Sequence, residues 1–441
     1  MKKFLSIVIA ISMIALCGCT KNDDQVKALK ICVDGTGFQE TNLLMSAFEE
    51  KYPNIQVEIE VFPEVKINYD SNYMPSVDTD SLAEREAVLQ QHRTALMAGS
   101  SDADLYIIGG GISQFDEFNG GALVQDPYDL MRNGVLGDLS GVLKMIEESD
   151  YLSSVFSEGQ MDDVQYLVPL RVSSSGMLVN LDGNIPFEHA KTREEMLKLL
   201  SETYARELGN LSGICNTPVT ALSYPVVNRQ EELISLQDDN YVTAFSEAKE
   251  FFELKSQFPS DDSYYADKIS RGDTLLCSMS NPLSVLAAAA SDLSRYESST
   301  NLACVPMYNE KDGITVEVAL YAFAPASSQN LETATMFLNW LLSQDVQNGT
   351  IPIFSSIVSY PLKKGCAKNQ LNQMGDYVLK CIGESALESL DEFETNVTDA
   401  KFASHYDYEM LSVLQKWQAQ TVELDVALEE LYSGWELYLD E

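Results

Sequence analysis

The 441-residue sequence has few basic residues and, after its first twenty positions, no long apolar run. Its 29 lysines and arginines stand against 67 acidic residues, which gives a formal net charge of −38. A surface this acidic repels the phosphate backbone of nucleic acids. A membrane-spanning helix needs about 20 consecutive apolar residues, and no later segment supplies them. The composition therefore predicts neither a nucleic-acid partner nor a transmembrane helix beyond position 20.

Motifs that commonly mark metal centres and catalytic sites are also missing. The sequence has three histidines and no Cys-x-x-Cys pair, and no histidine lies near a cysteine in the chain, which argues against a zinc site. Gly35-Thr36-Gly37 follows an expected strand but lacks the third glycine of a dinucleotide fingerprint. Neither Gly-x-Ser-x-Gly nor His-Glu-x-x-His occurs. We therefore expect no cofactor and no metal.

Six cysteines lie outside the N-terminal segment, far from one another and in apolar, strand-like surroundings. This setting predicts that most of them are buried as small apolar side chains. Sequence alone cannot pair them, so an extracellular disulfide stays open as an alternative. The six are Cys32, Cys215, Cys277, Cys304, Cys366 and Cys381.

The N-terminus carries the pattern of an export signal. Two lysines precede a thirteen-residue, largely apolar stretch (4–16), which as a helix would span about 20 Å, too short for a bilayer core of about 30 Å. The following Leu-Cys-Gly-Cys resembles a bacterial lipobox, in which Cys19 is acylated and becomes the first mature residue. We expect a signal peptide over 1–18, a lipidated tether over 19–28, and a protein anchored by lipid on the extracellular face of the cell membrane. An ordinary secretory signal with a chance cysteine is the alternative.

Strand and helix patterns alternate through most of the chain. Residues 41–51 place apolar side chains at helical spacing, 55–61 alternate as a half-buried strand, and 104–108 read as a buried strand. This order predicts an α/β fold with a largely parallel sheet. Residues 63–80 are expected to form a loop and 212–216 a strand. The acidic chain from residue 384 onward is expected to be helical.

Five segments in order resemble the family 1 extracellular solute-binding proteins of ABC importers, the carbohydrate-binding group that includes maltose-binding protein. The resemblance covers about Leu29–Gln347 and is carried by residues 44–61, 96–108, 163–180, 271–281 and 324–347. It implies a two-lobed, type II periplasmic-binding-protein fold with interleaved lobes, hinge crossovers and a helical C-terminal part. We expect lobe 1 to hold 29–170 plus 271–315 and lobe 2 to hold 171–270 plus 316–441. Crossings are expected at 169–176, 266–270 and 315–319.

The resemblance implies a receptor rather than an enzyme. Such a receptor, expected here as a monomer, binds a small solute, most simply a sugar or oligosaccharide, between its lobes and delivers it to the permease of an ABC transporter. Two alternatives stay open: a surface-anchored enzyme that acts on glycans, and a lipoprotein that senses a ligand without transport.

The expected ligand site lies where strands end, because open α/β sheets bind ligands beyond the carboxyl ends of their strands. In maltose-binding protein two aromatic side chains stack on sugar, but Val219 and Leu283 occupy the matching positions, so other aromatics, Tyr73 among them, are needed. Arg171 is expected either to contact ligand or to form a structural ion pair. The residues predicted to bind ligand are Asp34, Phe38, Gln39, Ser173, Ser175, Tyr224, Ser280, Asn281 and Tyr321.

Overall fold

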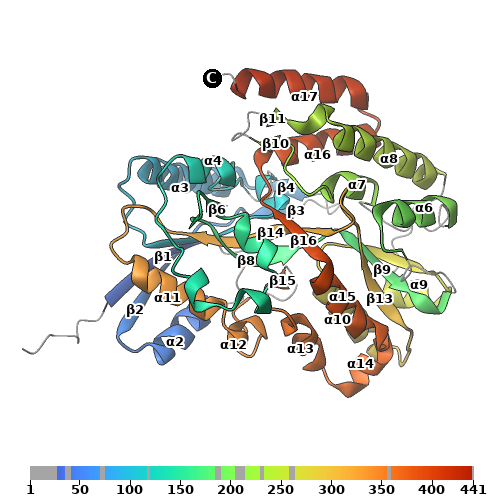
Figure 1. Ribbon diagram of the computed structural model, residues 1–441, viewed down its shortest axis with the longest axis horizontal. Coiled ribbons are helices and arrows are strands. Elements are labelled where there is room, and N and C mark those ends of the chain that lie inside the picture. Colours follow the sequence, from blue (N-terminus) through green and yellow to red (C-terminus); the bar gives the residue numbers. More distant parts are fainter. Residues whose placement is uncertain are drawn as a thin grey trace, which may run out of the picture.

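The protein folds as two α/β lobes, each built on its own sheet (Figure 1). The computed structural model describes residues 27–34, 41–69, 75–116, 120–183, 190–203, 214–228, 233–257, 264–354 and 359–439. Predictions for Cys19, Phe38, Gln39 and Tyr73 lie outside these ranges. No helix in the described ranges is long and apolar enough to cross a membrane.

The larger sheet has the strand order β15-β8-β14-β5-β1-β2, with β16 added to β14. β1 runs parallel to β2 and β5, whereas β14 is antiparallel to β5 and β8. Every residue of β5 is buried, as expected for a strand with helices on both faces. The strands are β1 (Lys27–Val33), β2 (Ile55–Val61), β5 (Leu105–Gly109), β8 (Val168–Ser173), β14 (Ile314–Phe323), β15 (Tyr360–Pro361) and β16 (Val397–Lys401).

Helices cover both faces of the larger sheet. α3 and α4 lie on one side, and α2, α11 and α12 lie on the other (Figure 1). On that second side Phe48 packs against Phe337 and Trp340, with ring centroids 4.8 and 5.2 Å apart. The helices are α2 (Thr41–Lys51), α3 (Thr79–Met97), α4 (Pro127–Arg132), α5 (Ser153–Ser157), α11 (Leu331–Leu341) and α12 (Gln344–Gln347).

The smaller sheet has the order β12-β9-β13, all antiparallel, and corrects the predicted lobe boundaries. Residues 271–315 were expected in lobe 1, but their strands β12 and β13 pair with β9 in lobe 2, and β14 returns to the larger sheet. Helical and strand periodicity does not say which sheet a strand joins. The elements are β9 (Gly176–Asn180), β12 (Leu275–Met279), β13 (Leu302–Pro306), α6 (Arg193–Thr203), α9 (Tyr265–Ser270), α10 (Pro282–Arg295), α13 (Cys366–Asn372), α14 (Asp376–Ile382) and α15 (Ser385–Asn396).

Four helices of lobe 2 form a second apolar core. It contains Tyr406 and Trp435, whose rings meet edge to face 5.3 Å apart, and it buries Val219 and Tyr241. This arrangement confirms the helical C-terminal part, although β16 interrupts it. The helices are α7 (Thr217–Thr220), α8 (Asp239–Ser256), α16 (His405–Gln418) and α17 (Leu424–Leu439).

Short elements complete the described fold and include two departures from prediction. The expected loop over 63–80 contains the hairpin of β3 and β4, and residues 214–216 form a helical turn rather than a strand. These elements are β3 (Ile67–Tyr69), β4 (Pro75–Val77), β6 (Gln160–Met161), β7 (Val164–Gln165), β10 (Val227–Asn228), β11 (Leu233–Ile234), η2 (Ile112–Phe115), η4 (Leu143–Met145), η5 (Glu148–Asp150), η6 (Leu181–Gly183), η9 (Ile214–Asn216) and η10 (Ser235–Gln237).

The chain crosses between the lobes at 174–175, 307–313 and 362–365, where it passes from one sheet or its helices to the other, and it returns to the larger sheet once more at β16, between α15 and α16. The first of these was predicted. The predicted crossing at 266–270 is wrong, because those residues form α9, which packs on β12 and α10 within lobe 2. The six described cysteines are free, and all but the half-buried Cys277 are buried, as the sequence predicted for most of them.

Candidate functional site

A buried arginine of α3 fixes the loops at one end of the larger sheet. Arg85 forms a two-point ion pair with Asp34 at the end of β1, and its Nη2 lies 2.7 Å from Asp34 Oδ2. The same guanidinium donates to the carbonyls of Pro63, at 3.0 Å, and Gly121, at 3.1 Å. Both charged side chains are about 2–3 % exposed. Asp34, predicted to bind ligand, instead holds Arg85 in place.

A second arginine, two turns further along α3, supports the same segment. Arg93 donates from Nε to the carbonyl of Leu123, at 3.0 Å, and from Nη2 to the carbonyl of Ala122. Burial lowers the pKa of Arg93, and the nearby Arg85 lowers it further. Residues 121–123 are therefore clamped against α3 by two cations, which gives this wall a fixed shape.

A cavity of about 830 Å³ lies between this wall and α16. Phe115 of η2 and Tyr408 of α16 are both half-buried and lie 6.4 Å apart between ring centroids. Most of the lining comes from lobe 1, and Tyr408 is the contribution of lobe 2. The lining residues are Leu82, Glu86, Leu89, Gln90, Arg93, Phe115, Asp116, Gly120, Gly121, Gln125 and Tyr408. The cavity thus combines two aromatic rings with carboxylate, amide and guanidinium groups.

A row of polar residues at the lobe crossings connects to this cavity through η2. Glu317 of β14 lies in register with Ser173 of β8 on one side and with Lys401 of β16 on the other. Its carboxylate accepts a hydrogen bond of 3.1 Å from the backbone N–H of Ile112, the first residue of η2. Burial raises the pKa of Glu317 to about 7, although that hydrogen bond and Lys401 lower it. The crossing strands therefore position the turn that carries Phe115.

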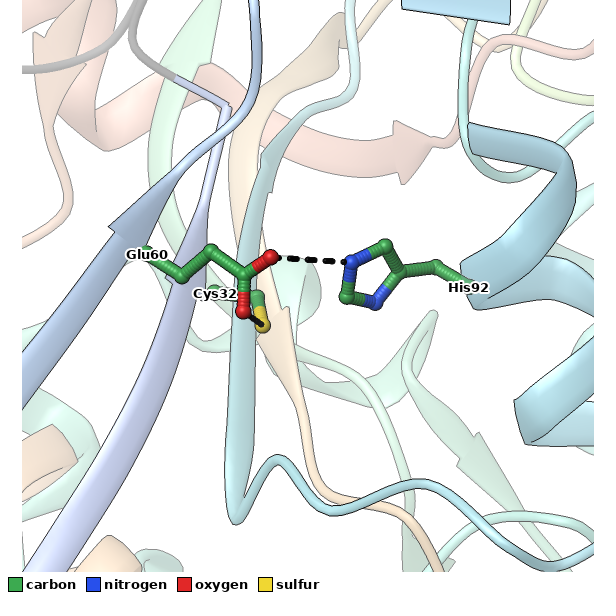
Figure 2. A group of neighbouring side chains, drawn as sticks. All are labelled: Cys32, Glu60 and His92. Atoms are coloured by element: carbon green, nitrogen blue, oxygen red, sulfur yellow. Dashed lines mark hydrogen bonds and ion pairs between the residues drawn. The ribbon is translucent and has the colours of Figure 1, made fainter. Parts of the chain in front are cut away.

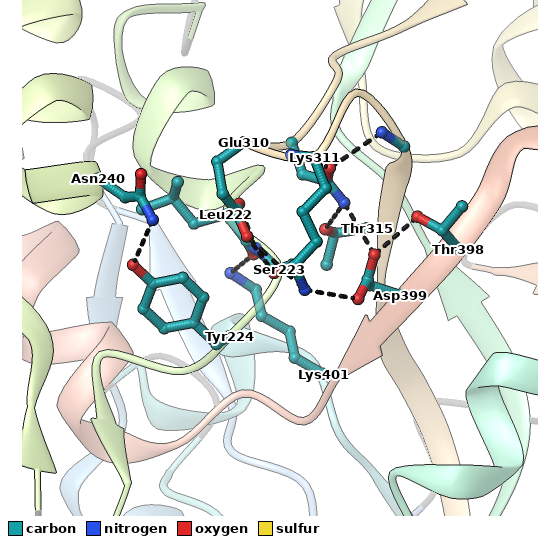
Figure 3. Close-up of polar contacts among 12 residues, drawn as sticks. Leu222, Ser223, Tyr224, Asn240, Glu310, Lys311, Thr315, Thr398, Asp399 and Lys401 are labelled. Carbon is teal, nitrogen blue, oxygen red and sulfur yellow. Dashed lines mark hydrogen bonds and ion pairs between the residues drawn. The ribbon is translucent and has the colours of Figure 1, made fainter.

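Polar contacts also tie the 307–313 crossing to its neighbours (Figure 3). Lys311 of this crossing contacts Asp399 of β16 at 3.1 Å, and Glu310 accepts hydrogen bonds from the hydroxyl and backbone N–H of Ser223. Lys401 donates to the carbonyl of Leu222 at 3.1 Å, and burial lowers its pKa. These contacts join the 307–313 crossing and β16 to the turn that follows α7.

Two predicted ligand residues have structural roles instead. Asn281 is 1 % exposed and caps α10, accepting hydrogen bonds from the N–H groups of Leu283 and Ser284. Tyr321 is 1 % exposed in β14, where it packs edge to face on Phe402 at 5.0 Å. A helix cap needs a polar side chain, and an apolar core often contains an aromatic ring. The sequence could therefore not distinguish these roles from ligand binding.

The predicted serines gather at the first crossing but do not line the cavity. Ser175 shares a hydrogen bond of 3.1 Å with Thr220, and the N–H of Ser174 donates to the carbonyl of the exposed Ser280 at 2.9 Å. Ser173 ends β8 beside Glu317. The sequence therefore correctly predicted that this segment lies where the two lobes meet.

Tyr224 and Arg171 are also engaged within the protein. The Tyr224 hydroxyl donates to Asp238, the cap of α8, at 2.9 Å. Arg171 is 1 % exposed, and its guanidinium lies 4.8 Å from the ring centroid of Phe354. Burial lowers the pKa of Arg171 to about 9. Within the described ranges it forms no ion pair, so neither expectation for this residue is confirmed.

Sequence reasoning predicted none of the residues that line this cavity, and the two aromatic rings, Phe115 and Tyr408, are the most telling omissions. Phe115 follows the glycine run that ends β5, so its position beyond a strand end was an available signal. Tyr408 lies on α16, far away in the sequence, and nothing local distinguishes it from the other aromatics of the acidic C-terminal helices.

Comparison with known proteins finds likeness in structure alone. No family model and no curated protein matches the sequence. The sugar-binding protein MalE from Xanthomonas citri superposes with a TM-score of 0.61 at 14 % identity, over 94 % of this chain and 98 % of that one. A family 1 extracellular solute-binding protein from Alicyclobacillus acidocaldarius gives 0.59 at 13 %, over 95 % and 100 %.

A third structure is the galacto-N-biose-/lacto-N-biose I-binding protein of an ABC transporter from Bifidobacterium longum, in complex with lacto-N-biose. It gives a TM-score of 0.58 at 12 % identity, over 93 % of this chain and 96 % of that one. Nearly full coverage of both chains in each case confirms the architecture that the five sequence segments implied. The chain therefore has the two-lobed, type II fold of the family 1 extracellular solute-binding proteins of ABC transporters.

Proposed function

We propose that this protein is a lipid-anchored extracellular receptor that binds a sugar or oligosaccharide between its lobes and delivers it to the permease of an ABC transporter. The observation that carries the proposal is the cavity between α3, η2 and α16, with Phe115 and Tyr408 beside polar side chains. Its volume of about 830 Å³ falls within the range of small-molecule sites, about 300–1,000 Å³.

The chemistry of the lining suits a carbohydrate. A sugar ring has apolar C–H faces, which pack on aromatic rings, and equatorial hydroxyls, which both donate and accept hydrogen bonds. Glu86 and Asp116 supply acceptors, Arg93 supplies donors, and Gln90 supplies both. The structural relatives named above support the same class, because two of them are described as binding sugars.

Delivery to a permease follows from lobe closure. Tyr408 belongs to lobe 2 and the rest of the lining to lobe 1, so a ligand touching both binds the closed arrangement better, and only that difference shifts the population. A permease that recognises the closed pair of lobe surfaces would transport only occupied receptor.

A thermal-shift screen of the purified protein against mono- and oligosaccharides tests the proposal. A ligand present at 100 times its Kd should stabilise the protein by about 2.7 kcal/mol. Tyr408→Ala and Phe115→Ala should each weaken that ligand at least about tenfold, or 1.4 kcal/mol. Tyr377→Ala is the matched control, since Tyr377 is 60 % exposed on α14 and does not line the cavity.

Two outcomes would contradict the receptor. Binding that both cavity variants leave unchanged would move the site elsewhere. Products accumulating from the bound saccharide would identify an enzyme. Small-angle scattering should also show a smaller radius of gyration with ligand, because closure brings the lobes together.

A further inference from the structure

Three side chains with metal-binding atoms meet between β1, β2 and α3, on the face of the larger sheet that α3 covers (Figure 2). Cys32 of β1 lies in register with Glu60 of β2 and with Tyr106 of β5, so the three side chains point to the same face. His92 reaches down from α3 onto this row. The ligand cavity does not include these residues.

The donor atoms lie close to, but not yet at, the spacing of a tetrahedral metal site. Cys32 Sγ lies 3.8 Å from Glu60 Oε2, and His92 Nε2 lies 3.4 Å from Glu60 Oε1. All three donor atoms lie within 4.8 Å of one another. Zinc bonds of about 2.3 Å to sulfur and about 2.0–2.2 Å to nitrogen and oxygen place neighbouring ligand atoms about 3.4–3.6 Å apart. Small rotations of these side chains would bring them onto one ion.

The surroundings already hold the ligands in place. His92 Nδ1 lies 2.9 Å from the Tyr106 hydroxyl, which in turn lies 2.9 Å from Ser101 Oγ. Hydrogen bonding of the second ring nitrogen is the usual way in which a metal-ligating histidine is oriented. This chain of contacts leaves His92 Nε2 facing Cys32 and Glu60.

The Lys30 ammonium group lies near the Glu60 carboxylate. Lys30 Nζ lies 3.3 Å from Glu60 Oε2 and 2.7 Å from Asp102 Oδ2. If Glu60 turns to a metal ion, Asp102 retains Lys30, so no charge loses its partner. The Glu60 side chain is 42 % exposed, whereas His92 is 9 % exposed, so the ion would enter from the Glu60 side.

We propose that Cys32, Glu60 and His92 form a zinc site in lobe 1, with a fourth position open to water from the Glu60 side. One thiolate, one imidazole and one carboxylate are ligands that Zn²⁺ accepts, and three protein ligands plus water is a common coordination for it. The site would tie α3 to β1 and β2, and α3 is also the helix that supplies Glu86, Gln90 and Arg93 to the cavity.

Zinc binding must displace the thiol proton. Burial raises the pKa of Cys32 to about 12, so the free protein carries the protonated thiol. Binding replaces the S–H bond with an S–Zn bond and releases that proton to solvent, with no change in oxidation state.

Cobalt(II), a spectroscopic substitute for zinc, tests the proposal directly. We expect the reduced, metal-free protein to bind one Co²⁺ with a sulfur-to-cobalt charge-transfer band, which Zn²⁺ then abolishes. Cys32→Ser should lose the band, and Glu60→Gln and His92→Ala should weaken Zn²⁺ binding at least tenfold. Cys304→Ser is the control, because Cys304 is a buried thiol outside the cluster.

The half-exposed position of Glu60 keeps the test valid if Cys32→Ser fails to fold. A band that survives in folded Cys32→Ser, or Zn²⁺ binding that Glu60→Gln leaves unchanged, would overturn the site. The absence of saturable binding in the unmodified protein would do so as well. Saccharide binding by Glu60→Gln is measured in parallel, so failure of the zinc site and failure of the receptor proposal are distinguished.

Discussion

Replacing Asp34 by alanine should destabilise lobe 1 far more than the loss of a surface ion pair. The substitution leaves the Arg85 guanidinium buried without its counter-ion, and among the described residues two backbone carbonyls remain as its partners. Removing one member of a buried pair costs about 3–5 kcal/mol, whereas an exposed pair contributes about 0–1 kcal/mol. Lys249→Ala is the matched control, because its contact with Asp425 is short, at 2.6 Å, but exposed.

Urea unfolding followed by tryptophan fluorescence can measure this effect in lobe 1 alone. The chain has three tryptophans, and Trp340 is the one packed in lobe 1 against Phe48. Changing Trp417 and Trp435 to phenylalanine leaves Trp340 as the single reporter. In that background we expect Asp34→Ala to lower the free energy of unfolding by about 3–5 kcal/mol.

The double variant Asp34→Ala/Arg85→Met distinguishes a charge effect from lost packing. It removes both charges, so it should be less destabilised than the sum of the two single variants by at least about 2 kcal/mol. A loss of less than about 1 kcal/mol in Asp34→Ala, no larger than in the Lys249→Ala control, would refute the reasoning.

Three further predictions address the hinge, a close backbone contact and the anchor. The pKa of Glu317 is raised in the folded state to about 7, so its contribution to stability is full below about pH 4.5 and is lost as the pH rises through 7. Glu317→Gln should therefore raise the free energy of unfolding by about 1–3 kcal/mol at pH 8 and change it little at pH 4.5. Thermal unfolding at the two pH values measures this difference, and equal effects at both would contradict the prediction. Gly110→Ala would press its methyl group against a backbone carbonyl of β14 and should lower the free energy of unfolding in urea by about 1–3 kcal/mol. Gly434→Ala, on the open face of α17, is the control and should not destabilise the protein. Equal losses in the two variants would argue against the close contact. Cys19→Ser should abolish incorporation of labelled fatty acid while Cys17→Ser leaves it intact, and a labelled Cys19→Ser protein would rule out the lipid anchor.

The sequence alone determined the elements whose formation depends on nearby residues. The helix over 41–51 and the strand over 55–61 have the predicted bounds, because apolar spacing of 3.6 or 2 residues is a local property. The five segments in order also predicted the two-lobed fold, and Ser173–Ser175 were correctly placed at a crossing between the lobes.

Tertiary structure alone decided which elements become neighbours. The segment 271–281 was one of the five that carried the resemblance, but the pairing of its strand β12 with β9 in lobe 2 depends on long-range packing that no local pattern encodes. The same holds for Phe115 and Tyr408, and for Cys32 with His92, each pair far apart in the sequence and brought together by the fold. Asp34 and Asn281 have the polar side chains that a ligand site requires, yet a buried ion pair and a helix cap require them too, and only the neighbours show which role each one has.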